Sequence, residues 1–275
     1  MFWYHLILII ALGLIVGSFI TSYTHRVAKG LKVSKGRSIC PNCKKKITWY
    51  DNIPVISYLI LRGKCRKCSE KISLRYPLIE ILTSLVFVLI YIAGNNCLSY
   101  PQSLFPVSNT ICMWYESIGL LVLPYFLFVC FALIATFITD YEHQMIPDTL
   151  SYSLFVLTFV MLIIVSPQDL YLRLFTGFFL SFSLLILHLV TLGRGMGLGD
   201  VKLVIFAGIL LGWQLSIVWI FSSFILGAMV GVLLIAVSKA KFGKQIAFGP
   251  FLIASFFLTI FFGNWLMDRF FPYLI

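Results

Sequence analysis

Long apolar runs separated by short polar stretches are the feature that most constrains how this chain can fold. Of its 275 residues, 60% are hydrophobic and 11% are charged, whereas soluble domains are about half apolar and a quarter charged. Runs of about 20 apolar residues are long enough to cross a bilayer as helices. The sequence therefore predicts an all-α polytopic membrane protein. It argues against a secreted disulfide scaffold, a nucleic-acid-binding domain and a disordered chain.

We expect about eight transmembrane helices, and the sixth of them is short enough to be broken or half-buried. They are expected over residues 4–23, 77–93, 118–139, 150–165, 171–192, 201–211, 215–237 and 250–267. The first apolar run has no basic segment before it and no clear small-residue cleavage site after it. We therefore interpret it as a retained helix rather than a signal peptide.

The basic residues predict the orientation of these helices. Of the 21 Lys and Arg residues, 14 lie between Arg26 and Arg75, with only two acidic residues among them. Cytoplasmic loops of membrane proteins carry an excess of Lys and Arg. Eight spans with this segment inside place 19 basic residues inside and only Arg173 and Arg269 outside. We expect both termini outside, the basic segment in the cytoplasm beside anionic lipid, and no nucleic-acid partner.

Four cysteines in the basic segment have the spacing of a metal site. Cys40 and Cys43 form one CxxC pair, and Cys65 and Cys68 form a second after 21 intervening residues. Cytoplasmic thiols stay reduced, so the two pairs are better interpreted as thiolate ligands of zinc than as disulfides. Four protein ligands leave no open position on the metal, which indicates a structural role.

The other cysteines are expected outside this segment. Cys97 and Cys112 lie between residues 94 and 117, in an expected outer loop. An oxidising exterior allows a disulfide there, and the spacing leaves open whether it forms. Cys130 lies within an apolar run, where a small core residue is expected. These assignments divide the chain into a first helix over 1–24, a cytoplasmic zinc-binding insert over 25–76 and a multi-helix membrane domain over 77–275.

Two carboxylates are expected at the inner membrane boundary. Asp140 ends the third apolar run, and Asp200 begins the sixth after Gly195, Gly197 and Gly199. Ionisable groups at such positions are costly and are candidates for function. Two adjacent carboxylates do not both ionise easily, so one can take a proton from water while the other donates one. The glycines allow unusual backbone angles and the close approach of another chain. The alternative is that Asp140 is a helix-end acid and Asp200 an N-cap.

In this arrangement the chain resembles the type IV prepilin peptidases, a family of GxGD-type aspartyl proteases. The match covers nearly the whole chain. The matching motifs are GSFITSYTHR over 17–26, SICPNC over 38–43, WYDNIPVISY over 49–58, RGKC over 62–65, ISLRYPLIE over 72–80, the aspartate motif over 140–148, GLGDVKL over 197–203 and FGPFL over 248–252. GxGD alone is a weak signal, whereas all of these motifs in order are highly specific.

The resemblance implies an enzyme of the bacterial cytoplasmic (inner) membrane with Asp140 and Asp200 as catalytic residues at the cytoplasmic face. It implies cleavage of a short basic leader, just after a glycine, from type IV prepilin or pseudopilin precursors. It also implies methylation of the new N-terminus with S-adenosylmethionine. Glu80 is a candidate for binding an ammonium in that reaction, and its alternative is a salt bridge to Arg75 or another base of the insert.

Three other hypotheses are compared with this one. The first is a peptidase alone, with a purely structural zinc insert. The second is a transporter whose carboxylates carry protons or cations, although no clear repeat relates the two halves of the chain. The third is a zinc-bearing scaffold of an assembly machine. The first-helix segment, and an outer loop longer than in compact members, depart from the family pattern and leave partner preference open.

Overall fold

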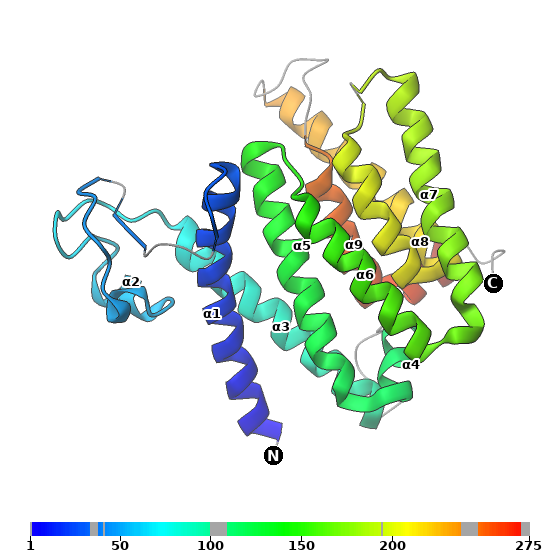
Figure 1. The fold of residues 1–275 in the computed structure, drawn as a ribbon, viewed down its shortest axis with the longest axis horizontal. Coiled ribbons are helices and arrows are strands. Elements are labelled where there is room, and N and C mark those ends of the chain that lie inside the picture. Colours follow the sequence, from blue (N-terminus) through cyan, green and yellow to red (C-terminus); the bar gives the residue numbers. More distant parts are fainter. Residues whose placement is uncertain are drawn as a thin grey trace. The chain divides into compact units, whose positions relative to one another are not determined.

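A computed structural model describes residues 2–33, 38–40, 42–99, 109–193, 195–237 and 247–270. These residues are mostly helical, with two isolated β-bridges (Figure 1). The helices are α1 Phe2–Ala28, α2 Ile56–Ile60, α3 Arg75–Ser99, α4 Asn109–Ile118, α5 Leu123–His143, α6 Asp148–Val165, α7 Leu170–Val190, α8 Leu198–Ala236 and α9 Gly249–Phe270, with 3-10 turns η1 Trp49–Asn52, η2 Gly119–Val122 and η3 Pro167–Asp169. The polytopic all-α fold is confirmed.

The chain forms two compact units. The first comprises Met1–Ile92 with Phe126–Ala135, and the second comprises Ala93–Tyr125 with Thr136–Ile275. Across the described residues, seven helices are long and apolar enough to cross a membrane, where the sequence predicted about eight. The difference arises at α8, which contains both the sixth and the seventh expected segments.

Helix α8 bends back on itself at Gly212. This residue has a φ of +74° and a ψ of 178°, which no helix contains. The rings of Phe206 and Trp219 lie 5.6 and 6.3 Å from the same ring, that of Phe256 in α9. In a straight helix the 13 intervening rises would separate them by about 20 Å. Helix α8 is therefore two legs, residues 198–211 and 213–236, that run back along each other (Figure 1).

The first leg of α8 packs tightly against α7. A methyl group on Gly208 would come 2.8 Å from the α-carbon of Gly177, and one on Gly177 would come 2.6 Å from the carbonyl oxygen of Ile205. Next along the same face, the Ser181 hydroxyl donates to the carbonyl oxygen of Val201 at 2.9 Å. Small residues that allow such close approach are typical of helix pairs in membranes. This contact fixes the leg that carries Asp200.

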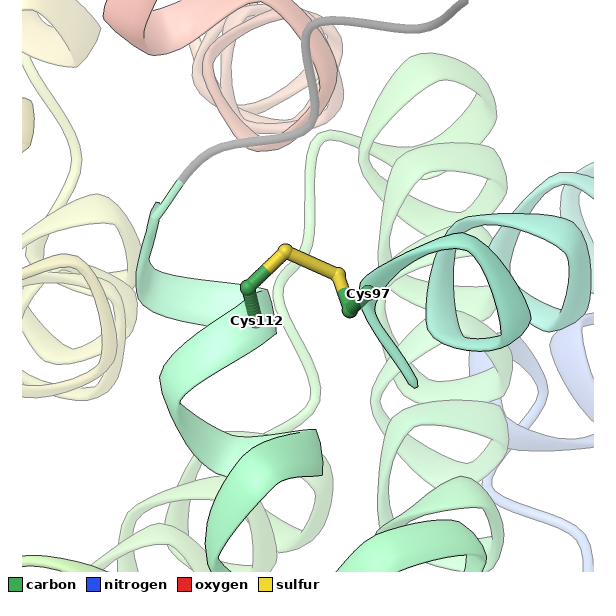
Figure 2. Close-up of a disulfide and its surroundings, with 2 residues drawn as sticks. All are labelled: Cys97 and Cys112. Atoms are coloured by element: carbon green, nitrogen blue, oxygen red, sulfur yellow. A yellow bond between two sulfur atoms is a disulfide. The ribbon is translucent and has the colours of Figure 1, made fainter. Parts of the chain in front are cut away.

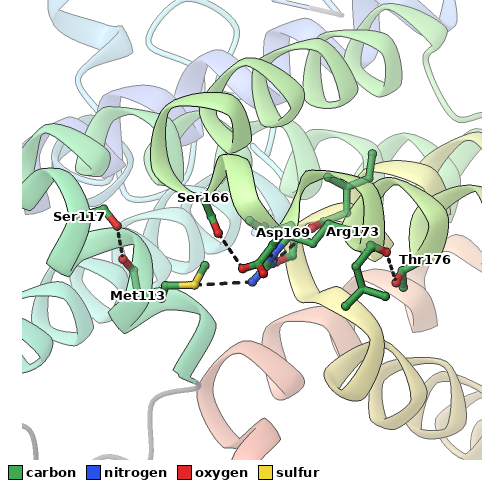
Figure 3. Close-up of polar contacts among 9 residues, drawn as sticks. Met113, Ser117, Ser166, Asp169, Arg173 and Thr176 are labelled. Atoms are coloured by element: carbon green, nitrogen blue, oxygen red, sulfur yellow. Dashed lines mark hydrogen bonds and ion pairs between the residues drawn. The ribbon is translucent and has the colours of Figure 1, made fainter.

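Arg173 caps the far end of that leg. Its Nη1 donates to the carbonyl oxygen of Leu210 at 2.8 Å, two residues before the break at Gly212. Because the helix is broken at Gly212, the last carbonyl groups before it lack helical N–H donors. The guanidinium of Arg173 donates hydrogen bonds to them instead. Figure 3 shows the surrounding contacts: Nη2 faces the sulfur of Met113 at 3.7 Å, and Nε lies 4.0 Å from the carboxylate of Asp169.

A disulfide joins Cys97 of α3 to Cys112 of α4 (Figure 2). The sequence left this pairing open. Much of the segment expected as a loop over 94–117 is helical, because α3 continues to Ser99 and α4 begins at Asn109. Gly94 leaves room for the ring of Tyr115 at this point, so the two helix ends pack closely beside the disulfide.

In the first unit, α1 and α3 pack through glycine. A methyl group on Gly13 would come 2.5 Å from the α-carbon of Ser84, and one on Gly17 would come 2.6 Å from that of Glu80. The Ser84 hydroxyl donates to the carbonyl oxygen of Ile10 at 3.1 Å. The four-residue spacing of the two glycines is that of the small-xxx-small contacts of membrane helices. The insert is thus attached to a closely packed helix pair.

Candidate active site and metal site

Asp140 and Asp200 come together at helix ends. Asp140 lies in the last turn of α5, and Asp200 is the third residue of α8. Both are buried, with 6% and 5% of their surfaces exposed. Asp140 is a helix-end acid, as the alternative interpretation had it, but a buried one. The structure brings its side chain together with that of Asp200.

Gly249, the first residue of α9, lies between the two carboxylates. A methyl group on Gly249 would come 2.5 Å from Asp140 Oδ2 and 3.3 Å from Asp200 Oδ1. Those two oxygens are therefore no further apart than the sum of these distances. Both oxygens are buried, and neither has a hydrogen-bond partner among the described residues. Buried oxygens without partners are costly, so this pair is a candidate for a functional site.

The glycines before Asp200 act through space rather than through unusual backbone angles. None of Gly195, Gly197 and Gly199 has a positive φ; the nearest residue that does among the glycines is Gly193. A methyl group on Gly199 would come 2.8 Å from the Cβ of Ile146, so this glycine allows the loop before α6 to lie against α8. The expected unusual angles are not found at these glycines, and the space at Gly199 is taken by Ile146 of the same chain.

The second oxygen of Asp200 is held by the backbone. The Gly197 N–H donates to Asp200 Oδ2 at 3.1 Å, which leaves Oδ1 facing Gly249. This is a capping contact at the start of α8, with the carboxylate at the positive end of the helix. The N-cap of α8 is Gly197, so Asp200 is not the N-cap that the alternative interpretation proposed, but a residue of the first helical turn that accepts from the N-cap N–H. Its other oxygen, Oδ1, has no hydrogen-bond partner among the described residues.

Asp148 lies apart from this pair. It is the first residue of α6, and its carboxylate forms a 2.7 Å ion pair with Lys202. More than half of its side chain is exposed. The pair joins the starts of α6 and α8, and its exposure makes Asp148 a surface ion-pair partner rather than a buried reactive group.

The four insert cysteines converge on one point. The sulfur atoms of Cys40, Cys43, Cys65 and Cys68 all lie within 4.8 Å of one another, and those of Cys40 and Cys68 are 3.8 Å apart. Zn–S bonds of about 2.3 Å in a tetrahedron place sulfurs about 3.8 Å apart. The donor set and its spacing fit a closed metal site, so this cluster can hold a metal ion.

Each CxxC pair belongs to a turn of the same construction, which the sequence analysis missed. In the first turn, Cys40 N–H donates to Lys45 O, Ile47 N–H donates to Ser38 O, and Lys44 has a φ of +57°. The same three features recur 25 residues later, in the turn that runs from Gly63 to Ile72. The signal in the sequence is the repeated CxxCxxKI over 40–47 and 65–72. Two equivalent turns facing one centre supply two sulfurs each.

Contacts of the second turn order the insert and its thiols. Arg66 donates from Nε and Nη2 to Asp51, at 2.9 and 2.7 Å to Oδ1, and these hydrogen bonds hold the pKa of Asp51 below its ordinary value. The backbone N–H groups of Lys67 and Cys68 lower the pKa of the Cys65 thiol to about 7. A thiolate at neutral pH is the form that binds metal.

Glu80 connects the insert to α3. Its Oε2 accepts a hydrogen bond of 2.8 Å from the N–H of Val55, a residue in the left-handed region with a φ of +58°. Arg75, the salt-bridge partner considered from the sequence, donates from Nη2 to the hydroxyl of Thr24 at 3.5 Å. Glu80 is buried against α1 at Gly17. Its contacts are those of a tether between the insert and the helix pair.

These features define a class: a polytopic helical membrane protein with a buried carboxylate pair and a four-cysteine cluster that can hold a metal ion. Residues 126–232 match the type IV leader peptidase family, and residues 11–93 match the bacterial peptidase A24 N-terminal domain. The chain belongs to the type IV leader peptidase family and is an enzyme of that family.

Relatives along nearly the full length of the chain carry a single description, prepilin leader peptidase/N-methyltransferase. The protein from Vibrio cholerae is 30% identical over 271 residues, which cover 94% of this chain and 96% of that protein. The protein from Neisseria gonorrhoeae is 30% identical over 272 residues, covering 89% and 86%. The protein from Aeromonas salmonicida is 34% identical over 233 residues, covering 83% and 72%. No solved structure matches the chain.

Proposed function

We propose that this chain removes the leader peptide from type IV prepilin or pseudopilin precursors by aspartyl-protease chemistry at Asp140 and Asp200. The observation that carries the proposal is the pair of buried oxygens without partners, one from each residue, on either side of Gly249. Family membership supports leader removal as the reaction. The names of the relatives support prepilins as the substrate class.

The proposed reaction uses one protonated and one ionised carboxyl group. The ionised group accepts a proton from water, and the resulting hydroxide adds to the carbonyl carbon of the scissile peptide bond. The protonated group donates to the carbonyl oxygen. As the tetrahedral intermediate collapses and the C–N bond breaks, the leaving amine takes a proton from the first carboxyl group, and one hydroxyl of the intermediate returns its proton to the second. Gly249 leaves the space through which an extended chain reaches both groups.

We propose that this site faces the cytoplasm of a bacterial inner membrane. Cys112 precedes α5 and Asp140 lies in its last turn, so the length of α5 separates the two residues. Likewise, the insert precedes α3 and Cys97 lies near its end, so the length of α3 separates these two. The proposed orientation therefore has the disulfide on one side of the membrane, and the basic insert and the aspartates on the other. An oxidising exterior suits the disulfide, and a reducing cytoplasm suits the free cysteines of the insert. The basic residues of the insert also fit the cytoplasmic side, where loops rich in Lys and Arg lie.

Selective labelling tests this orientation. In sealed spheroplasts treated with an impermeant reductant, an impermeant maleimide should label Cys97 and Cys112, and a Cys97→Ser/Cys112→Ser variant should remain unlabelled. Cys65 should be labelled only after the membrane is opened and the metal chelated. Labelling of Cys65 in sealed spheroplasts would contradict the proposed orientation.

We propose that the metal of the insert is structural zinc. The four sulfurs and their spacing fit a tetrahedral ion with no free position, so the ion holds the two CxxC turns together and takes no part in cleavage. Metal binding would stabilise the fold of the insert, because the short 3-10 and helical turns between the CxxC pairs are too small to fold stably by themselves.

We propose a second activity, methylation of the new N-terminus by S-adenosylmethionine, on the strength of the relatives' names. A groove of about 460 Å³ beside the second CxxC turn is lined by Arg62, Lys64 and Lys71, which repel a sulfonium cation. Glu80 stays the candidate ammonium ligand, although its contact with Val55 favours the tether role. The alternative is a peptidase alone with a structural insert.

Co-expression with a pilin-like precursor tests these activities together. The mass of the mature product is measured for wild type, Asp140→Asn, Asp200→Asn and, as a matched control, Asp268→Asn, an exposed carboxylate at the other end of α9. Leader-free product is expected with wild type and the control alone. Normal product from either active-site variant would contradict the aspartyl mechanism. A product of wild type without the added methyl mass, with cofactor present, would favour the peptidase alone.

A further inference from the structure

His188, near the end of α7, makes a hydrogen bond into the loop before Asp200. Its Nδ1 lies 2.7 Å from the carbonyl oxygen of Met196, a buried residue. A carbonyl oxygen only accepts, so Nδ1 carries the proton and donates. The partner it contacts connects it to the active site.

The carbonyl of Met196 and the N–H of Gly197 belong to the same peptide group. One side of this planar group is held by His188, and the other side donates to Asp200 Oδ2 at 3.1 Å. Because the peptide is rigid, fixing its carbonyl also fixes the direction of its N–H. Donation to the carbonyl polarises the group and strengthens the N–H as a donor.

The turn after α7 is built around the imidazole. The Gly193 N–H donates to the carbonyl oxygen of His188 at 2.8 Å, and Gly193 has a φ of +75°. A methyl group on Gly193 would come 3.2 Å from His188 Cε1. The Gly195 N–H donates separately to the hydroxyl of Thr191 at 3.2 Å. Gly193 therefore provides both the turn and the space for the ring.

We propose that His188 is a positioning residue for Asp200, acting through the Met196–Gly197 peptide group. The inference rests on the proposed role of Asp200 in cleavage. His188 sets which oxygen of Asp200 is held by the backbone and which faces Gly249. It touches neither substrate nor the reacting atoms, so its effect is on the rate of the chemical step rather than on substrate binding.

The test measures kcat and KM for cleavage of a purified precursor by the full-length protein in liposomes. His188→Ala should lower kcat about ten- to a hundredfold, with KM changed by less than about twofold. His188→Asn should restore most of kcat, because its amide Nδ2 can donate from nearly the same place. Gly193→Ala, which keeps the histidine but displaces its ring, should lower kcat as well.

Thr191→Val is the matched control, because it removes the hydroxyl that accepts from the Gly195 N–H and donates to the backbone carbonyls of Leu187 and His188, and it leaves both the imidazole and the 196–197 peptide group in place. Its kcat is expected within about twofold of wild type. A kcat for His188→Ala equal to that of wild type, or an equal loss in Thr191→Val, would overturn the positioning role. Asp200→Asn is measured in parallel. If it cleaves normally, the proposed function itself fails; if it is inactive while His188→Ala is normal, only this inference fails.

Discussion

The α-carbon of Gly249 lies against the carboxylate of Asp140, so closely that a methyl group there would come 2.5 Å from Oδ2. Gly249→Ala should therefore displace the carboxylate of Asp140 relative to that of Asp200, and lower the rate of leader cleavage by about a hundredfold or more. Gly231→Ala is the matched control, because no atom lies within 4 Å of the added methyl group and alanine favours a helix. Cleavage of a precursor, followed by gel shift, checks both variants. Wild-type rates in Gly249→Ala would show that the space is not used.

The capping contacts of Arg173 predict a stability effect. Arg173→Met leaves the carbonyls of Ile209 and Leu210 without their donor at the break in α8, and should lower the free energy of unfolding by about 1–3 kcal/mol. Arg173→Lys should retain part of this, because a single ammonium reaches one carbonyl. Thermal unfolding in detergent measures the change, with Arg269→Gln, at an exposed position, as control. Equal stability of Arg173→Met and wild type would contradict the capping role.

Zinc binding should weaken as the pH falls through about 7. Protons compete with the metal for the thiolates, and the backbone donors that lower the pKa of Cys65 keep it ionised above this pH. The pair of Asp51 with Arg66 should survive to lower pH, because the pKa of Asp51 lies below its ordinary value and the pair is lost only as the carboxylate protonates. Zinc affinity measured at pH 8 and pH 6 checks the first effect. An affinity that does not change with pH would contradict thiolate ligation.

Removal of the metal should loosen the insert and leave the helices folded. Chelation should expose the segment between Cys43 and Cys65 to proteolysis while the helical circular dichroism persists, and added zinc should restore protection. Cys43→Ser is the matching variant, and Cys130→Ser, a buried cysteine outside the cluster, is its control for loss of a thiol. Unchanged proteolysis after chelation would argue against a structural ion.

The membrane fold and the two sites were largely predictable because their signals are local. Apolar runs predict membrane helices, and paired CxxC motifs predict a metal site. Carboxylates at the ends of apolar runs are predicted to lie at the membrane boundary. The sixth and seventh segments were separated correctly in the sequence because Gly212 and its polar neighbour Gln214 interrupt the apolar run. The structure explains that interruption as a reversal of one helical element.

Other features depend on contacts between distant residues and left no local signal. The place of Gly249 between the aspartates depends on how α9 packs against α5 and α8. The bond from His188 depends on the path of the loop before Asp200. The equivalence of the two CxxC turns had a signal, the repeated CxxCxxKI, which appears only when the two segments are aligned with each other.

The central claim is that Asp140 and Asp200 act as one unit on the scissile bond. Single-turnover cleavage of a precursor is measured for Asp140→Asn, Asp200→Asn and the double variant, each checked for folding by its unfolding temperature. Residues that act as a unit are not additive, so the double variant should be no slower than either single variant. Losses that multiply in the double variant, or a wild-type rate in either single variant, would contradict the account.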